Sequence, residues 1–364
     1  MNAESRASLT LFFTPGLGPV KIKLLLEHFG NAEDAVSANL TKLREVQGLD
    51  SSSMAEIGGA KTLERADQEL ERAGKIGLEI VGLSSPAYPE ALRAIYDPPP
   101  VLWVRGDISR LEALRGPTPR SLGIVGTRTC SNFARAFTAE IARDLAQSGV
   151  SIISGLARGI DTAAHKAAID TNGSSIGVLG CGADRIYPPE NAKLSEGLTV
   201  ISGYPVGTPP AAHNFPARNR IIAGLSSGVI VVEGDVKSGS LITAVAALEA
   251  GRTVFAVPGR PGDPNARGPN RLLRDGAVLT ESANDVLEEL RWGIRSNEAR
   301  EIPKLDGNEA KVFAALEHVG TDGMLLDGIV SASGLNASEA TGTLMMLSFQ
   351  SLVLELPGGR WTRT

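Results

Sequence analysis

The chain has 364 residues and a formal net charge of −5 at pH 7, so it lacks the general basic coat of many nucleic-acid-binding proteins. No apolar run is long enough to cross a membrane, we expect no signal peptide, and the two cysteines form neither a metal-binding nor a Cys-x-x-Cys spacing. These features favour a cytoplasmic protein of two or three domains, in which any phosphate-binding surface is a local cluster of arginines.

Residues 1–75 are predicted to form a small helical domain. Apolar residues at helical spacing predict a helix over 20–29 and a second helical segment over 43–57, with glycine-containing turns beside them. Helix, glycine turn, helix is typical of a helix-hairpin-helix, whose turn amides hold a DNA backbone phosphate. A packed helical hairpin with glycine caps explains the same pattern, and the sequence leaves both open. Residues 61–75 are predicted to be a charged surface helix.

Residues 76–292 alternate between strand and helix patterns. A proline-rich connector leads to Val101–Val104, which we predict to be an edge strand. The alternation that follows predicts an α/β fold, a Rossmann-like doubly wound sheet. Residues 215–220 are predicted to lead into the helix at 221–225, and residues 260–270 to form a loop. Strands are predicted at 122–125, 150–153, 175–179, 198–202, 228–233 and 253–257, and further helices at 133–148, 163–169, 240–250 and 283–290.

Small residues and one arginine follow each of the first two strands of this sheet. Gly-Thr-Arg at 126–128 comes after the first strand, and Ser-Gly at 154–155 with Arg158 comes after the second. In an open parallel sheet the ligand crevice lies at the carboxyl ends of the strands. Helix N-termini at that edge offer free N–H groups to phosphate, and guanidinium groups grip phosphate in a bidentate way. The sequence therefore predicts a phosphate-binding crevice.

A second cluster combines an aromatic ring with cations. Phe215 stands near Arg218 and Arg220, outside any periodic apolar face. Binding of single-stranded DNA needs cations for phosphates and a flat ring for bases, at roughly 1–3 kcal/mol per stacked base. The alternative is a core phenylalanine with arginines in structural ion pairs. For Arg158, DNA contact and a turn-holding pair with Asp161 stay equally open.

Three other features of the domain have structural explanations beside the functional ones. Arg128 is either a DNA contact or a surface residue flanking a helix. His165, one turn after Asp161, is predicted to be a satisfied structural histidine. The turn at 238–243 suits a helix N-cap and a phosphate cradle at the same time, since capping uses only some of the N–H groups.

Residues 293–307 are predicted to be a linker, and residues 308–364 a winged-helix domain with three helices followed by two strands. This tail carries six acidic residues (Glu309, Glu317, Asp322, Asp327, Glu339 and Glu355) against three basic ones (Lys311, Arg360 and Arg363), which gives −3. Its third helix, 337–350, has no Lys or Arg, although a helix that enters a DNA groove normally carries bases. We therefore predict that the tail makes a protein contact and does not bind DNA strongly.

Five motifs in one order together resemble the DNA-processing protein A (DprA/Smf) family. They are Gly-Thr-Arg at 126–128, Ser-Gly-Leu-Ala-Arg-Gly-Ile-Asp at 154–161 with His165, Phe-Pro-Ala-Arg-Asn-Arg-Ile-Ile at 215–222, Ser-Gly-Ser-Leu-Ile-Thr at 238–243 and Pro-Gly at 258–259. The resemblance covers about residues 85–290, and the flanking helical and winged-helix regions are similar to that family's common layout.

The resemblance implies a cytoplasmic single-stranded-DNA-binding protein. It implies that the protein protects incoming DNA in natural transformation, loads RecA recombinase onto it and works as a homodimer through the Rossmann-like domain. Strand 228–232 and its neighbouring helices are candidates for the dimer surface, and equally for core. The residues expected to bind DNA are Gly126, Thr127, Arg128, Ser154, Gly155, Arg158, Phe215, Arg218, Asn219, Arg220, Ser238, Gly239, Ser240 and Asn270.

The rival class is an enzyme that binds or hydrolyses nucleotides, of the lysine-decarboxylase-like Rossmann group. No P-loop motif occurs, and the glycines at 180 and 182 are not completed into a dinucleotide fingerprint because Arg185 stands at the third place. The turn at 238–243 does not reproduce that group's Pro-Gly-Gly-x-Gly-Thr-x-x-Glu motif, although Glu233 and Glu249 are possible relics of such a site. We predict no catalytic residue, cofactor or metal; a scaffold that recruits RecA without touching DNA is the third alternative.

Overall fold

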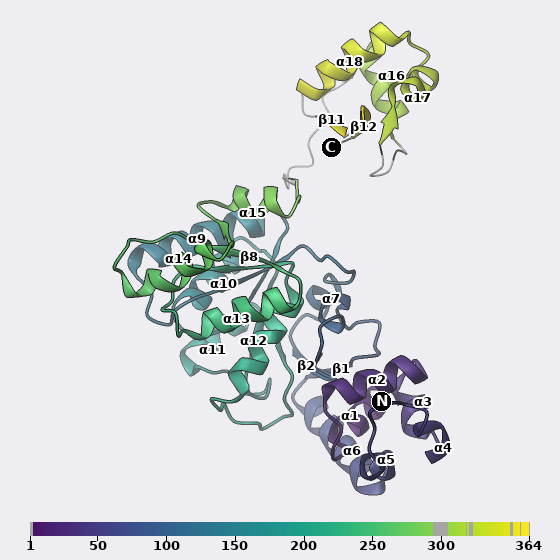
Figure 1. The fold of residues 1–364 in the computed structure, drawn as a ribbon, viewed down its shortest axis with the longest axis vertical. Coiled ribbons are helices and arrows are strands. Elements are labelled where there is room, and N and C mark those ends of the chain that lie inside the picture. The colour runs from purple at the N-terminus through teal and green to yellow at the C-terminus, as the bar shows by residue number, and fades with distance from the viewer. Residues whose placement is uncertain are drawn as a thin grey trace. The chain divides into compact units, whose positions relative to one another are not determined.

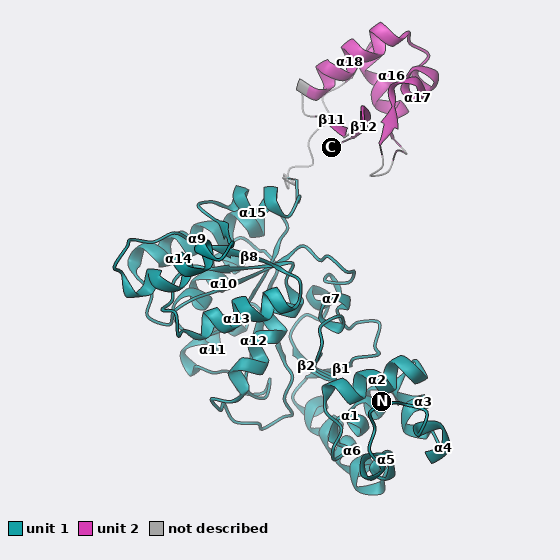
Figure 2. Ribbon diagram, in the orientation of Figure 1, with its two compact units in different colours: residues 1–297 teal, residues 298–364 magenta. Residues whose placement is uncertain are grey.

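We analysed a computed structural model, which describes residues 3–293, 305–317, 319, 323–349, 352–356 and 358–363. The chain forms two compact units, residues 1–297 and residues 298–364 (Figure 2). Most of the predicted linker, residues 294–304, lies outside the described residues. The further division of the first unit at residue 75 stays a prediction.

A nine-stranded sheet forms the centre of the first unit, in the order β1-β2-β6-β5-β4-β3-β7-β8-β9 (Figure 1). The strands from β6 to β9 in this order are all parallel, for example with Leu122 of β3 opposite Gly228 of β7. This confirms the predicted Rossmann-like doubly wound fold. The parallel strands are β3 (Ser121–Val125), β4 (Ser151–Ser154), β5 (Ser175–Leu179), β6 (Thr199–Ser202), β7 (Gly228–Val231), β8 (Thr253–Ala256) and β9 (Val278–Leu279).

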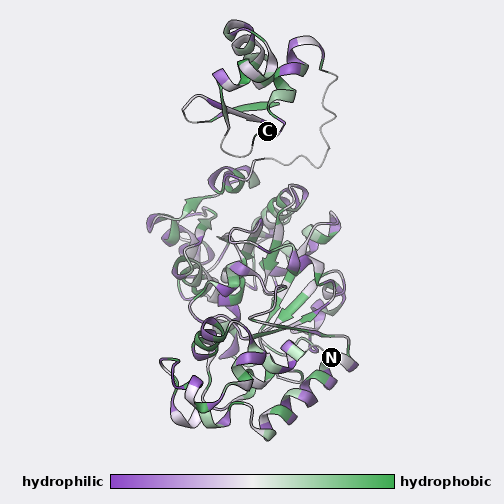
Figure 3. Ribbon diagram, turned by 90° about the vertical axis from the view of Figure 1, so that its right-hand side faces the viewer, coloured by the Kyte–Doolittle hydropathy of each residue, from purple (hydrophilic) through white to green (hydrophobic). Residues whose placement is uncertain are grey.

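Helices cover both faces of the sheet, because β3, β4, β5 and β7 are apolar on both sides and fully buried. Figure 3 shows apolar residues along strands of the first unit and helices that carry both apolar and polar residues. One face carries α9 (Asn132–Gln147), α10 (Ile160–Asp170) and α15 (Ala283–Glu289), and the other carries α12 (Asn214–Leu225), α13 (Gly239–Glu249) and α14 (Arg267–Arg274). A short helix, α11 (Ala192–Ser195), follows the 3₁₀ turn Pro189–Asn191.

Two sequence predictions within this unit were wrong. Helix α12 begins at Asn214, so Phe215 lies in its first turn and not in a loop. Helix α14 occupies 267–274, half of it inside the segment predicted to be a loop, after a 3₁₀ turn at Pro264–Ala266. In both cases a proline lies in the first turn of the helix, where it has no intrahelical hydrogen bond to lose.

The N-terminal helices pack on an antiparallel extension of the sheet, and the prediction of an edge strand there was also wrong. Strand β2 (Val101–Arg105) lies between β6 and β1 (Glu79–Gly82), so β1 is the edge. Trp103 of β2 is fully buried, and its Nε1 donates a hydrogen bond to Glu69 Oε1 at 2.8 Å. The helices of this region are α1 (Ala3–Phe13), α2 (Pro19–Phe29), α3 (Ala32–Ser37), α4 (Leu40–Leu43), α5 (Ser51–Glu56), α6 (Ala60–Lys75), α7 (Glu90–Arg93) and α8 (Ser109–Glu112).

The glycine turn before α2 leaves the helix-hairpin-helix hypothesis a prediction. Lys21 donates to Gly16 O at 3.0 Å and to Asp50 Oδ2 at 2.6 Å, so the lysine beside the turn already has an acidic partner. Asp50 also caps α5 by accepting from Ser53 N. The packed hairpin and a phosphate site on the turn amides remain compatible with this arrangement.

The second unit is a winged helix, as predicted. Helices α16 (Gly307–Ala315), α17 (Leu326–Ser333) and α18 (Ala337–Phe349) share a core with strands β11 (Val353–Leu356) and β12 (Arg360–Arg363). A third strand, β10 (Met324–Leu325), pairs with β12 and was not predicted. Among the described residues of the whole chain, no helix has the length and apolar character needed to cross a membrane.

Candidate nucleic-acid interface

A crevice opens at the point where the strand order of the sheet reverses. The chain runs from β3 through β4 and β5 to β6, then returns to place β7 on the other side of β3. In sheets of this kind, ligands bind beside the carboxyl ends of the strands at this switch point. A cavity of about 310 Å³ lies there, lined by residues 125–128 after β3, by 238–240 and Thr243 of α13, and by Phe215, Arg218 and Asn219 of α12.

The ring of Phe215 lies close to two guanidinium groups on one side of this crevice. The guanidinium carbon of Arg128 is 5.5 Å from the centre of the Phe215 ring, and that of Arg218 is 5.6 Å away. Phe215 is half-buried, with its ring against Gly180 and 6.3 Å from the ring of Tyr187. Arg128 is exposed and has no ion pair or hydrogen bond with any residue that the structure describes. A cation without an ionic partner in the described part of the chain and a partly exposed aromatic ring therefore lie together.

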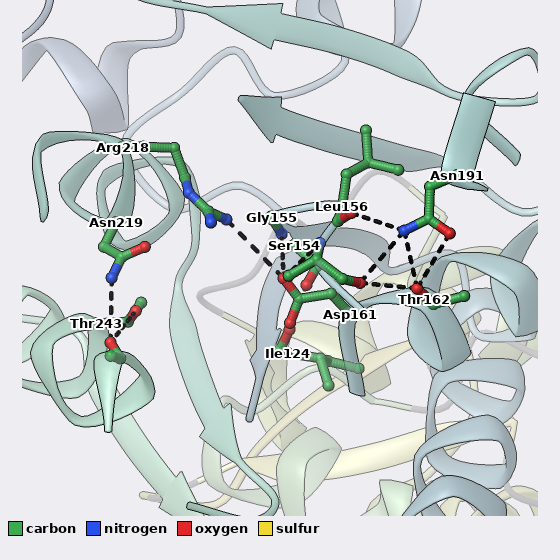
Figure 4. Close-up of polar contacts among 12 residues, drawn as sticks. Ile124, Ser154, Gly155, Leu156, Asp161, Thr162, Asn191, Arg218, Asn219 and Thr243 are labelled. Atoms are coloured by element: carbon green, nitrogen blue, oxygen red, sulfur yellow. Dashed lines mark hydrogen bonds and ion pairs between the residues drawn. The ribbon is translucent and has the colours of Figure 1, made fainter. Parts of the chain in front are cut away.

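Arg218 lies deeper in the crevice, where it faces Asp161 of α10 (Figure 4). Its Nη1 is 3.9 Å from Asp161 Oδ2, both side chains are buried, and Nε has no hydrogen-bond partner in the described part of the chain. Burial lowers the pKa of Arg218, the Asp161 carboxylate raises it, and the positive charge of Arg128 lowers it further. An arginine still stays protonated at neutral pH, so Arg218 is a buried cation with unused donors.

Gly155 makes room for this arginine. A Cβ atom at position 155 would lie 1.2 Å from Arg218 Nη1, so only glycine allows the guanidinium to reach Asp161. The Gly155 and Ala157 N–H groups donate to Asp161 Oδ2 at 3.0 and 3.2 Å. Burial raises the pKa of Asp161, while Arg218 and the two N–H donors offset part of that effect. Gly155 thus leaves room for the cation, and its N–H is used by Asp161 and not by a ligand.

The loop after β4 is fixed by residues that the sequence analysis did not single out. Asn191 Nδ2 donates to Leu156 O at 2.8 Å and to Thr162 Oγ1 at 3.0 Å, which ties the loop to the 3₁₀ turn at 189–191 (Figure 4). Leu156 is fully buried with a positive φ of 55°, a strained conformation for a branched side chain. Ser154 is buried as well and donates to Ile124 O at 2.6 Å, so its hydroxyl supports the loop and faces no ligand.

The N-terminus of α13 forms the opposite side of the crevice. Ser238 Oγ and Ser240 Oγ are 2.6 Å apart and bond to each other, so Ser238 caps no helix N–H with its side chain. Asn219 Nδ2 donates to Gly239 O at 3.1 Å and thereby joins α12 to α13. The first N–H groups of this eleven-residue helix consequently lack side-chain caps on the side of Arg128 and Arg218.

Three predicted contacts lie apart from this cluster or have other partners. Arg158 is exposed and forms an ion pair with Glu190, not with Asp161 as the alternative proposed. Arg220 points away from the crevice and bonds to Asp97 Oδ2 at 2.6 Å. The Asn270 amide exchanges two hydrogen bonds with the backbone of Gly259, at 2.9 and 3.1 Å, and does not line the crevice cavity.

The other titratable groups near the crevice have structural roles. His165 is fully buried, and its Nδ1 bonds to Ser175 Oγ at 2.8 Å, but Nε2 has no partner among the described residues. Burial, helped by Arg218, lowers the pKa of His165 to about 3. Glu233 accepts from Ser131 N and Oγ and so holds the N-terminus of α9. The described residues contain no group of three or more His, Cys, Asp or Glu that could hold a metal ion.

Comparison with known proteins identifies the family. The family model described as DNA recombination-mediator protein A matches residues 79–291, more than half of the chain. The chain belongs to this family. A second model, the DprA winged helix domain, matches residues 296–359, so the two units each correspond to a part of the family's layout.

Relatives and solved structures of the family extend over most of the chain. Protein Smf of Synechocystis is 35% identical over 100% of this chain and 99% of its own length, and DNA processing protein DprA of Bacillus subtilis is 46% identical over 59% of this chain and 72% of its own. The X-ray structure of DprA from Streptococcus pneumoniae matches with a TM-score of 0.67 and 34% identity, covering 79% of this chain and 99% of its own. The structure of DNA processing protein A from Helicobacter pylori, described as showing a unique single-stranded-DNA binding mode, matches with a TM-score of 0.52 and 30% identity. It covers 59% of this chain and 96% of its own.

Proposed function

We propose that the crevice binds single-stranded DNA. The observation that carries this proposal is the partly exposed ring of Phe215 beside two cations. One is Arg128, which is exposed and has no anionic partner among the described residues, and the other is the buried Arg218. A ring face takes a base and the guanidinium groups take the adjacent phosphates, which is how proteins hold single strands without reading their sequence. The uncapped N–H groups of α13 add a further phosphate donor.

Two further facts support a single strand over a duplex. The phenylalanine is half-buried in a crevice, where only an unstacked base can reach its face. The Helicobacter pylori relative, which is 30% identical, is described as binding single-stranded DNA. The DNA contacts that we propose are therefore Arg128, Phe215, Arg218 and the N-terminus of α13, with Gly126, Thr127 and Asn219 lining the same cavity.

The deciding experiment is a salt titration of binding to single- and double-stranded oligonucleotides. Wild type is compared with Arg128→Ala and with Arg72→Ala, an exposed arginine of α6 that serves as the matched control. We expect tight binding to the single strand that weakens with salt, a loss of about tenfold or more in Arg128→Ala, and no change in Arg72→Ala, because each phosphate contact contributes a counterion-release term. Equal affinity for both DNA forms, or an indifferent Arg128→Ala variant, contradicts the proposal.

We further propose that the protein is not an enzyme but protects incoming single strands in transformation and loads RecA recombinase onto them in the cytoplasm. Incubation with nucleoside monophosphates, followed by a search for free base, tests the rival hydrolase function, and release of base contradicts ours. For RecA, the measurement is the rate of RecA filament growth on single-stranded DNA with wild type and with Arg128→Ala. A scaffold that does not touch DNA would accelerate growth equally in both forms.

A homodimer through the first unit is part of the same proposal. Strand β7, one of the candidates for its surface, is buried within the sheet, but α13 exposes Ile242, Val245 and Leu248 on one face, each 46–60% exposed. Three apolar side chains on one helix face mark an interaction surface. Light scattering on Val245→Glu should give the 38.0 kDa monomer where wild type gives twice that mass, and a wild-type monomer contradicts the dimer.

A further inference from the structure

A groove with basic walls lies beside the crevice, between α9 and α10. It encloses about 580 Å³. Its floor is made by small side chains, among them Ala139, Ala163 and Ala167, which leave the space between the two helices open. Four cations stand along its walls: Arg135, Arg143, Arg158 and Lys166.

The cations of this groove are mostly without partners. Arg135, Arg143 and Lys166 are exposed, and none of them has an ion pair or a side-chain hydrogen bond with a residue that the structure describes. The two acids in the groove are Glu190, which is paired with Arg158, and Asp170 at the C-terminal end of α10. Unpaired like charges in a concave surface repel each other and concentrate anions.

The acidic residues of α9 do not neutralise this wall. Arg135 and Arg143 are eight residues apart on α9 and both line the groove, whereas Glu140 and Asp144 of the same helix do not line it. Neither acid forms an ion pair with these arginines in the part of the chain that the structure describes. The two arginines border the groove in a protein whose total charge is negative.

The groove continues from the crevice. Arg158 lines both the groove and the pocket formed by Arg128, Tyr187 and Phe215, so a strand that leaves the ring of Phe215 past Arg158 enters the groove. Both α9 and α10 begin at the carboxyl ends of parallel strands, and their first turns therefore lie at the crevice. From Arg135 to Arg143 the helix rises about 12 Å, which matches about three to four stacked nucleotides.

We propose that this groove is a second subsite for the same nucleic-acid strand and holds its sugar–phosphate backbone after the strand passes Phe215. This inference rests on the proposed function of the crevice. No aromatic side chain among the described residues lines the groove, so it binds through charge alone and takes any sequence. The crevice then orients the strand by stacking, and the groove adds affinity only to strands long enough to reach it.

The test compares oligonucleotides of two lengths. A triple variant, Arg135→Ala with Arg143→Ala and Lys166→Ala, is measured beside a matched control on α6, Lys61→Ala with Arg72→Ala and Lys75→Ala. Fluorescence anisotropy is recorded with oligo(dT) of about six and about twenty nucleotides over a range of salt. For the groove variant we expect unchanged binding of the short oligonucleotide, about tenfold weaker binding of the long one, and a salt slope lower by about 2, since each of three contacts to a single strand contributes about 0.7.

The outcomes separate this inference from the proposed function. If Arg128→Ala abolishes binding of both lengths while the groove variant binds the long oligonucleotide like wild type, the groove proposal is overturned and the crevice stands. If neither length binds wild type, or Arg128→Ala is indifferent, the proposed function itself fails. An equal loss in the α6 control also overturns the groove, because the effect is then a general one of net charge.

A variant expected to bind more tightly provides a test that misfolding cannot mimic, because a misfolded protein would lose affinity for DNA. Asp170→Asn removes the unpaired acid at the far end of the groove and should strengthen binding of the long oligonucleotide about two- to threefold without affecting the short one, because one repulsive charge is gone. Unchanged affinity for the long oligonucleotide in this variant, together with intact folding by thermal melt, counts against the groove.

Discussion

The two units of this protein both have architectures that bind DNA in other proteins, yet only one presents the chemistry for it. The crevice of the first unit places Phe215 beside both Arg128 and Arg218. The third helix of the winged helix, α18, has no Lys or Arg and instead exposes Met345 and Met346, each by more than half. The difference teaches that a fold sets where a site can be, and the side chains at that place decide what it binds.

The two arginines of the winged helix are also engaged within it. Arg363 donates to Phe313 O at 2.6 Å and lies over the Phe313 ring at 4.0 Å. Arg360 donates to Gly323 O at 3.0 Å. In the crevice, by contrast, Arg128 has no such partner among the described residues. The arginines of the winged helix fasten its own strands, whereas Arg128 and Arg218 of the first unit line an open cavity.

The largest expected effect comes from removing the ring of the crevice. Phe215→Ala should weaken binding of single-stranded DNA by about 1–3 kcal/mol, or about five- to 150-fold, because a stacked base loses its platform. Phe215→Tyr keeps a ring and should stay close to wild type. Met346→Ala, a truncation on α18, should leave the affinity unchanged; equal losses in Phe215→Ala and Met346→Ala would erase the contrast between the units.

The next largest effect should be a difference between the two units in how their unfolding free energy depends on pH. Burial lowers the pKa of His165 from 6.5 to about 3, so between these values the unfolded chain binds a proton that the folded chain does not. The contribution of the neutral, buried His165 to the unfolding free energy is complete above pH 6.5 and is lost as the pH falls toward 3. The first unit should therefore lose about 2 kcal/mol of unfolding free energy between pH 7 and pH 5, at about 1.36 kcal/mol per pH unit below 6.5.

Denaturant unfolding at the two pH values measures this effect. His165→Gln should have a flatter pH dependence than wild type, and His28→Gln, which changes an exposed histidine, should follow wild type. Residues 308–364 contain one histidine, His318, so a His318→Gln background removes its titration from the comparison of the two units. Parallel pH dependences in wild type and His165→Gln would contradict the prediction.

A smaller effect, of opposite sign, is expected at the mouth of the crevice. Arg158 is held by Glu190 in an exposed ion pair, which competes with phosphate. Glu190→Gln should release the arginine and strengthen binding of single-stranded DNA about two- to fivefold, the range expected for an exposed pair. Arg158→Ala should weaken it. Titration of the double variant tests whether Arg158 and Glu190 act as a pair. Its affinity for single-stranded DNA should equal that of Arg158→Ala alone. Additive effects of the two changes would show that Glu190 does not act through Arg158.

The smallest effect is expected from removing the winged helix altogether. Deletion of residues 308–364 leaves the first unit with its own core and should change the affinity for single-stranded DNA by less than about twofold, because this segment has a net charge of −3 and few free cations. The measurement is the same anisotropy titration. Loss of DNA binding in the deletion variant would overturn the proposal that the tail makes a protein contact.

Local sequence pattern predicted the doubly wound sheet and the winged helix correctly. Buried parallel strands such as β3 and β7 are unbroken apolar runs, and glycine or serine marks their ends. These two local features are enough to predict the strands. The helix predicted to begin at residue 221 begins at Asn214, because the proline at position 216 is accepted in the first turn of a helix. The short β1, four residues with an exposed first residue, gave too little pattern to predict its pairing with β2.

The partners of the site arginines could not be read from the sequence. Pattern placed the arginines near the strand ends, but Arg158–Glu190 spans 32 residues and Arg220–Asp97 spans 123, and such pairs depend on tertiary packing. Asp161 was noted only as a possible partner of Arg158, whereas it faces Arg218. The requirement for Gly155 likewise became clear only from the position of the Arg218 guanidinium.

The three tryptophans of the chain make its regions separately visible to fluorescence. Trp103 is buried where the N-terminal helices meet β2, Trp292 follows α15 at the edge of the main core, and Trp361 lies in the winged helix. Because Trp103 is fully buried and bonded to Glu69 of α6, detachment of the N-terminal helices would move its emission to longer wavelength. Variants that keep one tryptophan each would therefore follow the loosening of each region in turn while DNA or a partner protein is added.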